Sequence, residues 1–82
     1  MATRPRVLLL DDDQELLDMY KEILAQMPSN PEIETASSGA RAIALLEARQ
    51  FTMMITDLNM PKMDGLQVLS IVRRKYPQLR IV

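Results

Sequence analysis

The chain has 82 residues, of which 48% are hydrophobic and 26% charged, a composition typical of one small folded domain. Ten Lys and Arg against eleven Asp and Glu leave a net charge of -1, which gives no overall attraction for nucleic acid or anionic lipid. Cysteine and histidine are both absent, so disulfides, thiolate chemistry and the commonest general base are excluded. No early apolar run is long enough for a signal peptide or a membrane span, and we expect a cytoplasmic location.

The first predicted element is a strand near residues 6–10, whose run Val-Leu-Leu-Leu has no polar alternation. Such a run is expected of a strand that is buried on both faces of a parallel sheet. A run of three aspartates ends it. A helix near residues 13–27 follows, because apolar residues recur at helical spacing until Pro28. Asp12 and Glu15 are spaced as a capping-box pair at the start of this helix.

The middle of the chain predicts a second strand, a second helix and a third strand. Residues 32–36 alternate polar and apolar side chains, which indicates a short strand at the edge of the sheet. Residues 39–48 are rich in alanine and leucine and favour a helix. The apolar run that follows predicts a buried strand near residues 51–57, which ends at Asp57.

The last part of the chain predicts a third helix near residues 65–76 and, at 80–82, the start of a fourth strand. Asp64 is placed to cap this helix, with Gln67 in the reciprocal position. Strands and helices therefore alternate through residues 1–82. The order predicts a single α/β domain with a parallel sheet and right-handed crossovers.

Carboxylates follow the two apolar strands at the points where these strands end. Asp11 and Asp12 come after the first strand, and Asp57 ends the third. If the two strands are neighbours, about 4.8 Å apart, the carboxylates converge at the sheet edge where open parallel sheets bind ligands. Like charges this close repel unless a hard divalent cation such as Mg²⁺ lies between them. A carboxylate oriented by such a cation can accept a phosphoryl group as an aspartyl phosphate.

Three segments of the sequence resemble a known family, the receiver domain of two-component response regulators. The segments are VLLLDDDQELL (Val7 to Leu17), ETASSGARAIALL (Glu34 to Leu46) and MMITDLNMPKMDGLQVL (Met53 to Leu69). The resemblance covers essentially the whole chain. It implies a flavodoxin-like, doubly wound parallel sheet, incomplete here as βαβαβα plus the start of a fourth strand.

The resemblance also implies a role for each acidic residue. Asp57 would be the phosphoacceptor, which receives phosphate from a histidine kinase or a phosphotransfer protein. Asp12 would bind Mg²⁺ directly, Asp11 mainly through water, and Asn59 through its backbone carbonyl, and Asp57 itself would belong to the same metal set. Asp13 looks like a helix-start residue. Nucleic acid would be contacted only through an output domain outside these residues.

The chain departs from the family pattern at its end. Receivers that resemble it have five βα units, and this sequence stops before the family's Ser or Thr on strand four and Lys on strand five. We therefore expect a fragment of a longer regulator, or self-association through the uncovered sheet edge.

Two other functions stay open from the residues. The first is an interaction or dimerisation piece that keeps only the acidic pocket. The second, more distant, is a phosphatase of the haloacid dehalogenase type, to which Asp11-x-Asp13 is superficially similar. As a receiver, the chain would phosphorylate itself from a donor and would not turn over an external substrate.

Overall fold

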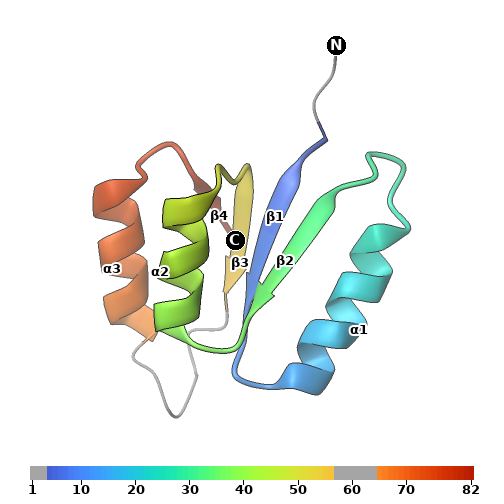
Figure 1. The fold of residues 1–82 in the computed structure, drawn as a ribbon, viewed down its shortest axis with the longest axis horizontal. Coiled ribbons are helices and arrows are strands. Elements are labelled where there is room, and N and C mark those ends of the chain that lie inside the picture. Colours follow the sequence, from blue (N-terminus) through green and yellow to red (C-terminus); the bar gives the residue numbers. More distant parts are fainter. Residues whose placement is uncertain (1–3, 57–64) are drawn as a thin grey trace.

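The structure is a computed structural model that describes residues 4–56 and 65–82. Strands and helices alternate along the described chain, and Figure 1 shows their arrangement. In chain order they are β1 (Arg6–Leu10), α1 (Gln14–Ala25), β2 (Glu32–Ala36), α2 (Gly39–Ala48), β3 (Met53–Thr56), α3 (Gly65–Lys75) and β4 (Arg80–Ile81).

The described strands form one parallel sheet in the order β2-β1-β3-β4. The two uninterrupted apolar runs, β1 and β3, are therefore neighbours in the centre of the sheet, and the alternating strand β2 lies at its edge. The predicted edge position of β2 and the predicted α/β fold with a parallel sheet are both confirmed. A central strand loses both faces to the core, whereas an edge strand keeps polar side chains in water.

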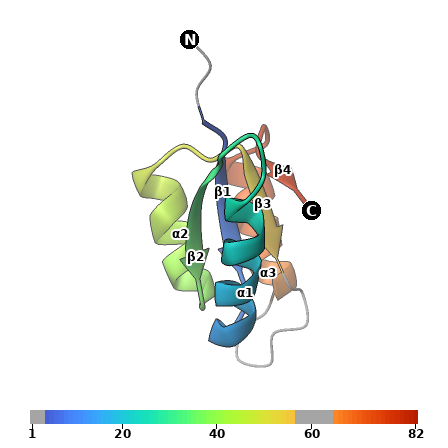
Figure 2. The same cartoon turned by 90° about the vertical axis from the view of Figure 1, so that its right-hand side faces the viewer.

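Helices cover the two faces of the sheet unequally. The helices α2 and α3 pack on one face, where Leu8, Met54 and Val72 are fully buried. On the other face α1 alone packs against the sheet, over Leu9 and its neighbours. Figure 2 shows that no helix of the described chain lies in front of β4 on this side. The face under α2 and α3 has the larger cluster of buried side chains and therefore holds most of the core. Each fully buried leucine contributes about 1.5–3 kcal/mol of transfer free energy.

The start of α1 differs from the capping pair that the sequence predicted. Asp13, not Asp12, is the N-cap, and its carboxylate accepts the backbone N–H groups of Glu15 at 3.0 Å and Leu16 at 3.3 Å. The prediction of an Asp12–Glu15 capping box was therefore wrong, and that of a helix-start role for Asp13 is confirmed. Asp13 has the extended backbone that places a carboxylate over the first free N–H groups.

The end of α1 lies at Ala25, two residues before the predicted boundary at residue 27. The N–H of Gln26 bonds to the Ile23 carbonyl at 3.2 Å, which tightens the last turn. Met27 precedes a proline, and a residue in that position is sterically disfavoured in helical geometry. The predicted cap at Asp64 lies outside the described residues. In the described part of the chain, no helix is long and apolar enough to cross a membrane.

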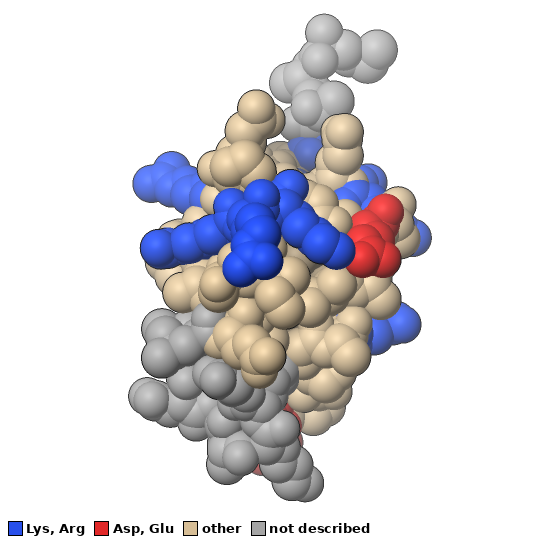
Figure 3. Space-filling view, turned by 90° about the vertical axis from the view of Figure 1, so that its left-hand side faces the viewer, with Lys and Arg blue, Asp and Glu red and all other residues tan. Residues whose placement is uncertain are grey.

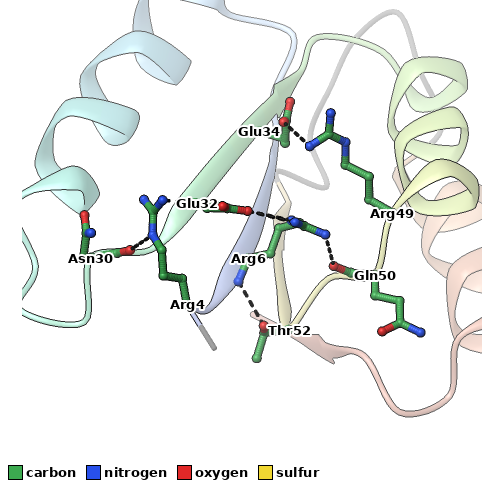
Figure 4. Close-up of polar contacts among 8 residues, drawn as sticks. All are labelled: Arg4, Arg6, Asn30, Glu32, Glu34, Arg49, Gln50 and Thr52. Carbon is green, nitrogen blue, oxygen red and sulfur yellow. Dashed lines mark hydrogen bonds and ion pairs between the residues drawn. The ribbon is translucent and has the colours of Figure 1, made fainter. Parts of the chain in front are cut away.

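A polar network ties the strands together at the amino end of the sheet, opposite to the aspartates (Figure 4). The Arg6 guanidinium donates to Glu32 Oε2 from Nε at 3.0 Å and from Nη2 at 2.9 Å, and its Nη1 donates to the Gln50 carbonyl at 3.2 Å. The backbone N–H of Arg6 donates to Thr52 Oγ1 at 3.0 Å. The network thus joins β1, β2 and the segment before β3. The hydrogen bond and the charge of Arg6 lower the pKa of the Glu32 carboxyl.

Candidate phosphoacceptor site

The register of β1 and β3 shows that these two neighbouring strands end side by side. Leu10 pairs with Thr56 at the carboxyl ends of these strands. Asp11 is the next residue after Leu10, and Asp57 is the next residue after Thr56. Asp57 lies outside the described residues, as does Asn59. Asp11 and Asp12, which form the described part of the predicted site, therefore lie beside the carboxyl end of β3.

Asp11 is the one buried charged residue of the described chain, with 7% of its surface exposed. Its Oδ1 accepts the backbone N–H of Asp13 at 2.9 Å. Its own backbone N–H donates to the carbonyl of Ala36, the last residue of β2, at 3.2 Å. Burying a carboxylate costs several kcal/mol unless hydrogen bonds or a cation compensate. This carboxylate is therefore held in a fixed place by β2 and by the start of α1.

The other two aspartates of the acidic run, Asp12 and Asp13, differ in burial and in contacts. Asp12 is half-buried beside Asp11, and Asp13 is exposed and caps α1. The amino end of a helix carries partial positive charge, which stabilises carboxylates placed before its first turn. The beginning of α1 thus lowers the electrostatic cost of gathering these aspartates at one point.

The donor atoms at this point suit a hard cation. Asp11 and Asp12 offer carboxylate oxygens, the ligand type that Mg²⁺ prefers, and the chain has no histidine or cysteine that would favour a softer metal. Within residues 4–56 and 65–82 no group of three acidic side chains is placed to hold a metal. The third carboxylate of the predicted set is that of Asp57, beyond the described part. The described residues therefore fit part of a magnesium site.

Sequence reasoning missed the two backbone groups that position Asp11. The N–H of Asp13 and the carbonyl of Ala36 fix the carboxylate and the main chain of Asp11 respectively. The first contact had a signal in the sequence, because an aspartate two residues before a helix cap commonly accepts the N–H of the residue two positions on. The second depends on the pairing of β1 with β2, which the sequence does not specify.

A groove runs from Asp11 along α1 on the less covered face of the sheet. It encloses about 400 Å³, and side chains of β1, α1 and β3 line it, mostly apolar ones. Tyr20 and Ile23 on its rim are 41% and 57% exposed. The helical stripe that the sequence predicted on α1 is therefore buried at Leu17 but open to water at Ile23.

The fold and the site define the class of this protein. It is an α/β domain with a parallel sheet, and a buried aspartate follows its strand β1 at the edge where such sheets bind ligands. The family described as "Response regulator receiver domain" matches residues 7–82, and the chain belongs to this family. The receiver prediction is thereby confirmed, and the phosphatase alternative loses its support.

Two of the curated relatives that match are bacterial response regulators. The chain is 34% identical over 77 residues to the response regulator protein FleR of Pseudomonas aeruginosa, and it covers 16% of that protein. It is 36% identical over 76 residues to the nitrate/nitrite response regulator protein NarL of Escherichia coli, and it covers 35% of that protein. The match takes in 94% and 93% of this chain. The chain thus spans well under half the length of these relatives.

Solved structures show the same fold. A receiver domain protein of Methanospirillum hungatei superposes with a TM-score of 0.88 at 28% identity, over 96% of this chain and 62% of that one. The response regulator protein TrrA of Thermotoga maritima, in complex with Mg²⁺-BeF, superposes with a TM-score of 0.84 at 30% identity, over 94% of this chain and 65% of that one. TrrA has also been solved in complex with the histidine kinase ThkA, with a TM-score of 0.83 to this chain at 30% identity and the same coverage.

Proposed function

We propose that the chain accepts a phosphoryl group on Asp57 from the phosphohistidine of a partner kinase or phosphotransfer protein. The observation that carries this proposal is the buried carboxylate of Asp11. Asp11 directly follows Leu10, and Leu10 pairs with Thr56, the residue before Asp57. A fixed buried carboxylate at the ligand-binding edge of a parallel sheet is costly for stability, and a role in binding explains why it is there.

In the proposed reaction a carboxylate oxygen of Asp57 attacks the phosphorus atom. The new O–P bond forms as the N–P bond of the phosphohistidine breaks, and the imidazole leaves with the bonding electron pair and takes up a proton. The product is an acyl phosphate on Asp57. No general base is needed, because a carboxylate nucleophile has no proton to give up when it attacks.

Asp11, Asp12, Asp57 and the backbone carbonyl of Asn59 would hold Mg²⁺ in this proposal, Asp12 directly and Asp11 mainly through water. When bound, Mg²⁺ neutralises the charge that the phosphoryl oxygens bring to the acidic site. The N–H of Asp13 keeps the Asp11 carboxylate turned to one side by its 2.9 Å bond. Asp11 and Asp12 are thus assigned to cation binding alone, whereas Asp57 is assigned both to cation binding and to the attack on phosphorus.

The relatives support the choice of cation and of partner. The TrrA structure contains Mg²⁺-BeF, and the ThkA structure pairs a histidine kinase with TrrA, each at 30% identity to this chain. We extend both features to this chain by similarity, and we place the reaction in the cytoplasm. Nucleic acid has no part in the proposal, because a cluster of carboxylates repels a phosphate backbone.

The test is the intact mass of the purified chain before and after treatment with Mg²⁺ and acetyl phosphate. We expect one added phosphoryl group, which does not appear when EDTA is present before acetyl phosphate is added and is absent in Asp57→Asn. Asp13→Asn is the matched control, since asparagine is an equally good helix cap and the variant removes one carboxylate without touching a proposed ligand. Phosphorylation that survives in Asp57→Asn, or no phosphorylation of the wild type at any Mg²⁺ concentration, would overturn the proposal.

We also propose that these 82 residues self-associate through the uncovered edge of the sheet at β4. The observation that favours it is the short outer strand β4, followed by Val82 with 66% of its surface exposed. An edge strand presents unpaired backbone groups that another chain can pair with, and a lysine placed there discourages such pairing. Sedimentation velocity should show association that rises with concentration and falls in Val82→Lys but not in Val82→Thr. A monomer at every concentration would contradict this second proposal.

A further inference from the structure

Basic side chains gather at the amino end of the sheet, on the far side from the aspartates. Arg73, Arg74 and Lys75 form the last turn of α3, and all three are exposed. Figure 3 shows Lys and Arg side chains crowded on this face of the molecule, with an acidic patch at the right-hand edge of the cluster. Arg49 lies nearby at the end of α2. We call these four residues the basic rim.

A groove of about 560 Å³ opens beside the basic rim. Its cationic wall is formed by Arg49 and Lys75, and its apolar wall includes Phe51 and Tyr76, which are half-buried and pack against the core. Gln50 and Gln78 also line it and supply amide donors and acceptors. The groove thus has one cationic wall and one apolar wall.

The cations of the rim are only weakly neutralised by the protein itself. Lys75 lies 3.7 Å from Glu47, and Arg49 lies 3.6 Å from Glu34, and these four side chains are between 34% and 57% exposed. Exposed ion pairs of this kind contribute about 0–1 kcal/mol, so an incoming carboxylate can replace either partner. Arg73 and Arg74 make no ion pair with any residue in the described part of the chain. The rim therefore carries excess positive charge on a chain whose net charge is -1.

Helix electrostatics explain only part of this arrangement. Cations in a last helical turn are favoured by the helix dipole, which accounts for the three basic residues of α3. The dipole of α2 favours Arg49 at its C-cap in the same way, but neither dipole accounts for an open groove lined by aromatic rings between the two helix ends. The coincidence of charge and groove points to a ligand with both acidic and apolar groups.

We propose that this groove docks an acidic peptide segment of a protein partner. One apolar side chain of the segment fills the groove over Phe51 and Tyr76, and the carboxylates on either side of it pair with the basic rim. A peptide suits the site better than a nucleic acid does, because Phe51 and Tyr76 form an apolar wall and a polyanionic backbone has no apolar group to place against it. The groove and the run Asp11 to Asp13 lie at opposite ends of the sheet, so docking leaves the Asp11 end uncovered.

The test is fluorescence anisotropy with the labelled peptide Glu-Glu-Leu-Glu-Glu added to the full chain. We expect saturable binding that weakens with salt, together with weaker binding of Gln-Gln-Leu-Gln-Gln and of Glu-Glu-Gly-Glu-Glu. Arg74→Glu combined with Lys75→Glu should lower the affinity by about tenfold, since each rim charge contributes about twofold to fivefold. The matched control is Lys21→Glu combined with Arg41→Glu, which makes the same change in net charge at exposed positions of α1 and α2 outside the groove.

Circular dichroism should show that both double variants keep their helix content. Equal losses in the two double variants would reduce the effect to net charge and overturn the docking site, as would the absence of saturable binding. Equal affinity for the glycine peptide would remove the groove from the interaction. Tighter binding of a single-stranded oligothymidylate than of the peptide would assign the rim to nucleic acid instead. Phosphorylation of Asp57 does not enter this assay, so its outcome is independent of the phosphoacceptor proposal.

Discussion

The two faces of the sheet should respond differently when adjacent core leucines of β1 are cut back to alanine. Leu8 is 0% exposed and packs under α2 and α3, whereas Leu9 is 1% exposed, packs under α1 and lines the open groove of about 400 Å³. A leucine-to-alanine change in a core costs about 2–5 kcal/mol, and the cost is lowest where the surroundings can collapse into the space left behind. We therefore expect Leu8→Ala to cost about 4–5 kcal/mol and Leu9→Ala about 2–3 kcal/mol.

These losses are large for a chain of 82 residues, whose total stability is expected at about 4–12 kcal/mol. Urea unfolding followed by far-ultraviolet circular dichroism measures them. With a slope of about 1 kcal/mol per molar urea, the midpoint of Leu8→Ala should lie about 1–3 M below that of Leu9→Ala. Ile23→Ala, at a position that is 57% exposed, is the control and should change stability by less than about 0.5 kcal/mol. Equal costs at the two leucines, or a higher cost at Leu9, would refute the unequal covering of the sheet.

Three further predictions concern polar contacts. Asp13→Ala removes the cap of α1 and should lower the free energy of unfolding by about 1 kcal/mol in the same urea assay, whereas Asp13→Asn should change it little. Thr52→Ala removes the acceptor of the 3.0 Å bond from the Arg6 N–H and should cost about 0.5–1.5 kcal/mol, and Thr52→Ser should restore most of the loss. Arg6 lowers the pKa of Glu32 from the ordinary value of 4.5, so Glu32 adds stability above that pH and loses it as the pH falls through the folded-state pKa. The gap in urea midpoint between wild type and Glu32→Gln should accordingly close on acidification, and a gap that stays constant would contradict the Arg6 contact.

The central strands were predictable because burial on both faces leaves a plain signature. The runs of β1 and β3 are uninterrupted apolar segments, and they are neighbours in the sheet as expected. The alternating β2 was equally plain as an edge strand. In each case the sequence pattern reports how many faces of the strand meet the core.

The helix ends were less predictable because several residues compete for each one. Three consecutive aspartates can each cap α1, and only the backbone geometry selects Asp13, since Asp11 is tied to β2 through Ala36. At the other end, Pro28 signalled a stop, but tight hydrogen bonds at Gln26 end the helix earlier. Neither choice is encoded in a local pattern alone.

The network around Arg6 was missed altogether because it depends on register. Arg6 pairs across the sheet with Glu32, 26 positions away, and its backbone bonds to Thr52, 46 positions away. The sequence shows these residues but not which of them face each other. The basic rim had a visible signal in Arg73, Arg74 and Lys75, yet only the fold places Arg49 and a groove beside them.

The most direct test of the phosphoacceptor assignment is to find the residue that carries the acyl phosphate. The chain is treated with Mg²⁺ and acetyl phosphate and reduced with borohydride, which converts an aspartyl phosphate to homoserine, and the peptides are sequenced by mass spectrometry. Homoserine at position 57, and none at Asp11 or Asp12, is the predicted result. Homoserine at Asp11 or Asp12, or at no aspartate under conditions in which the chain is folded, would contradict the assignment of Asp57 as the phosphoacceptor.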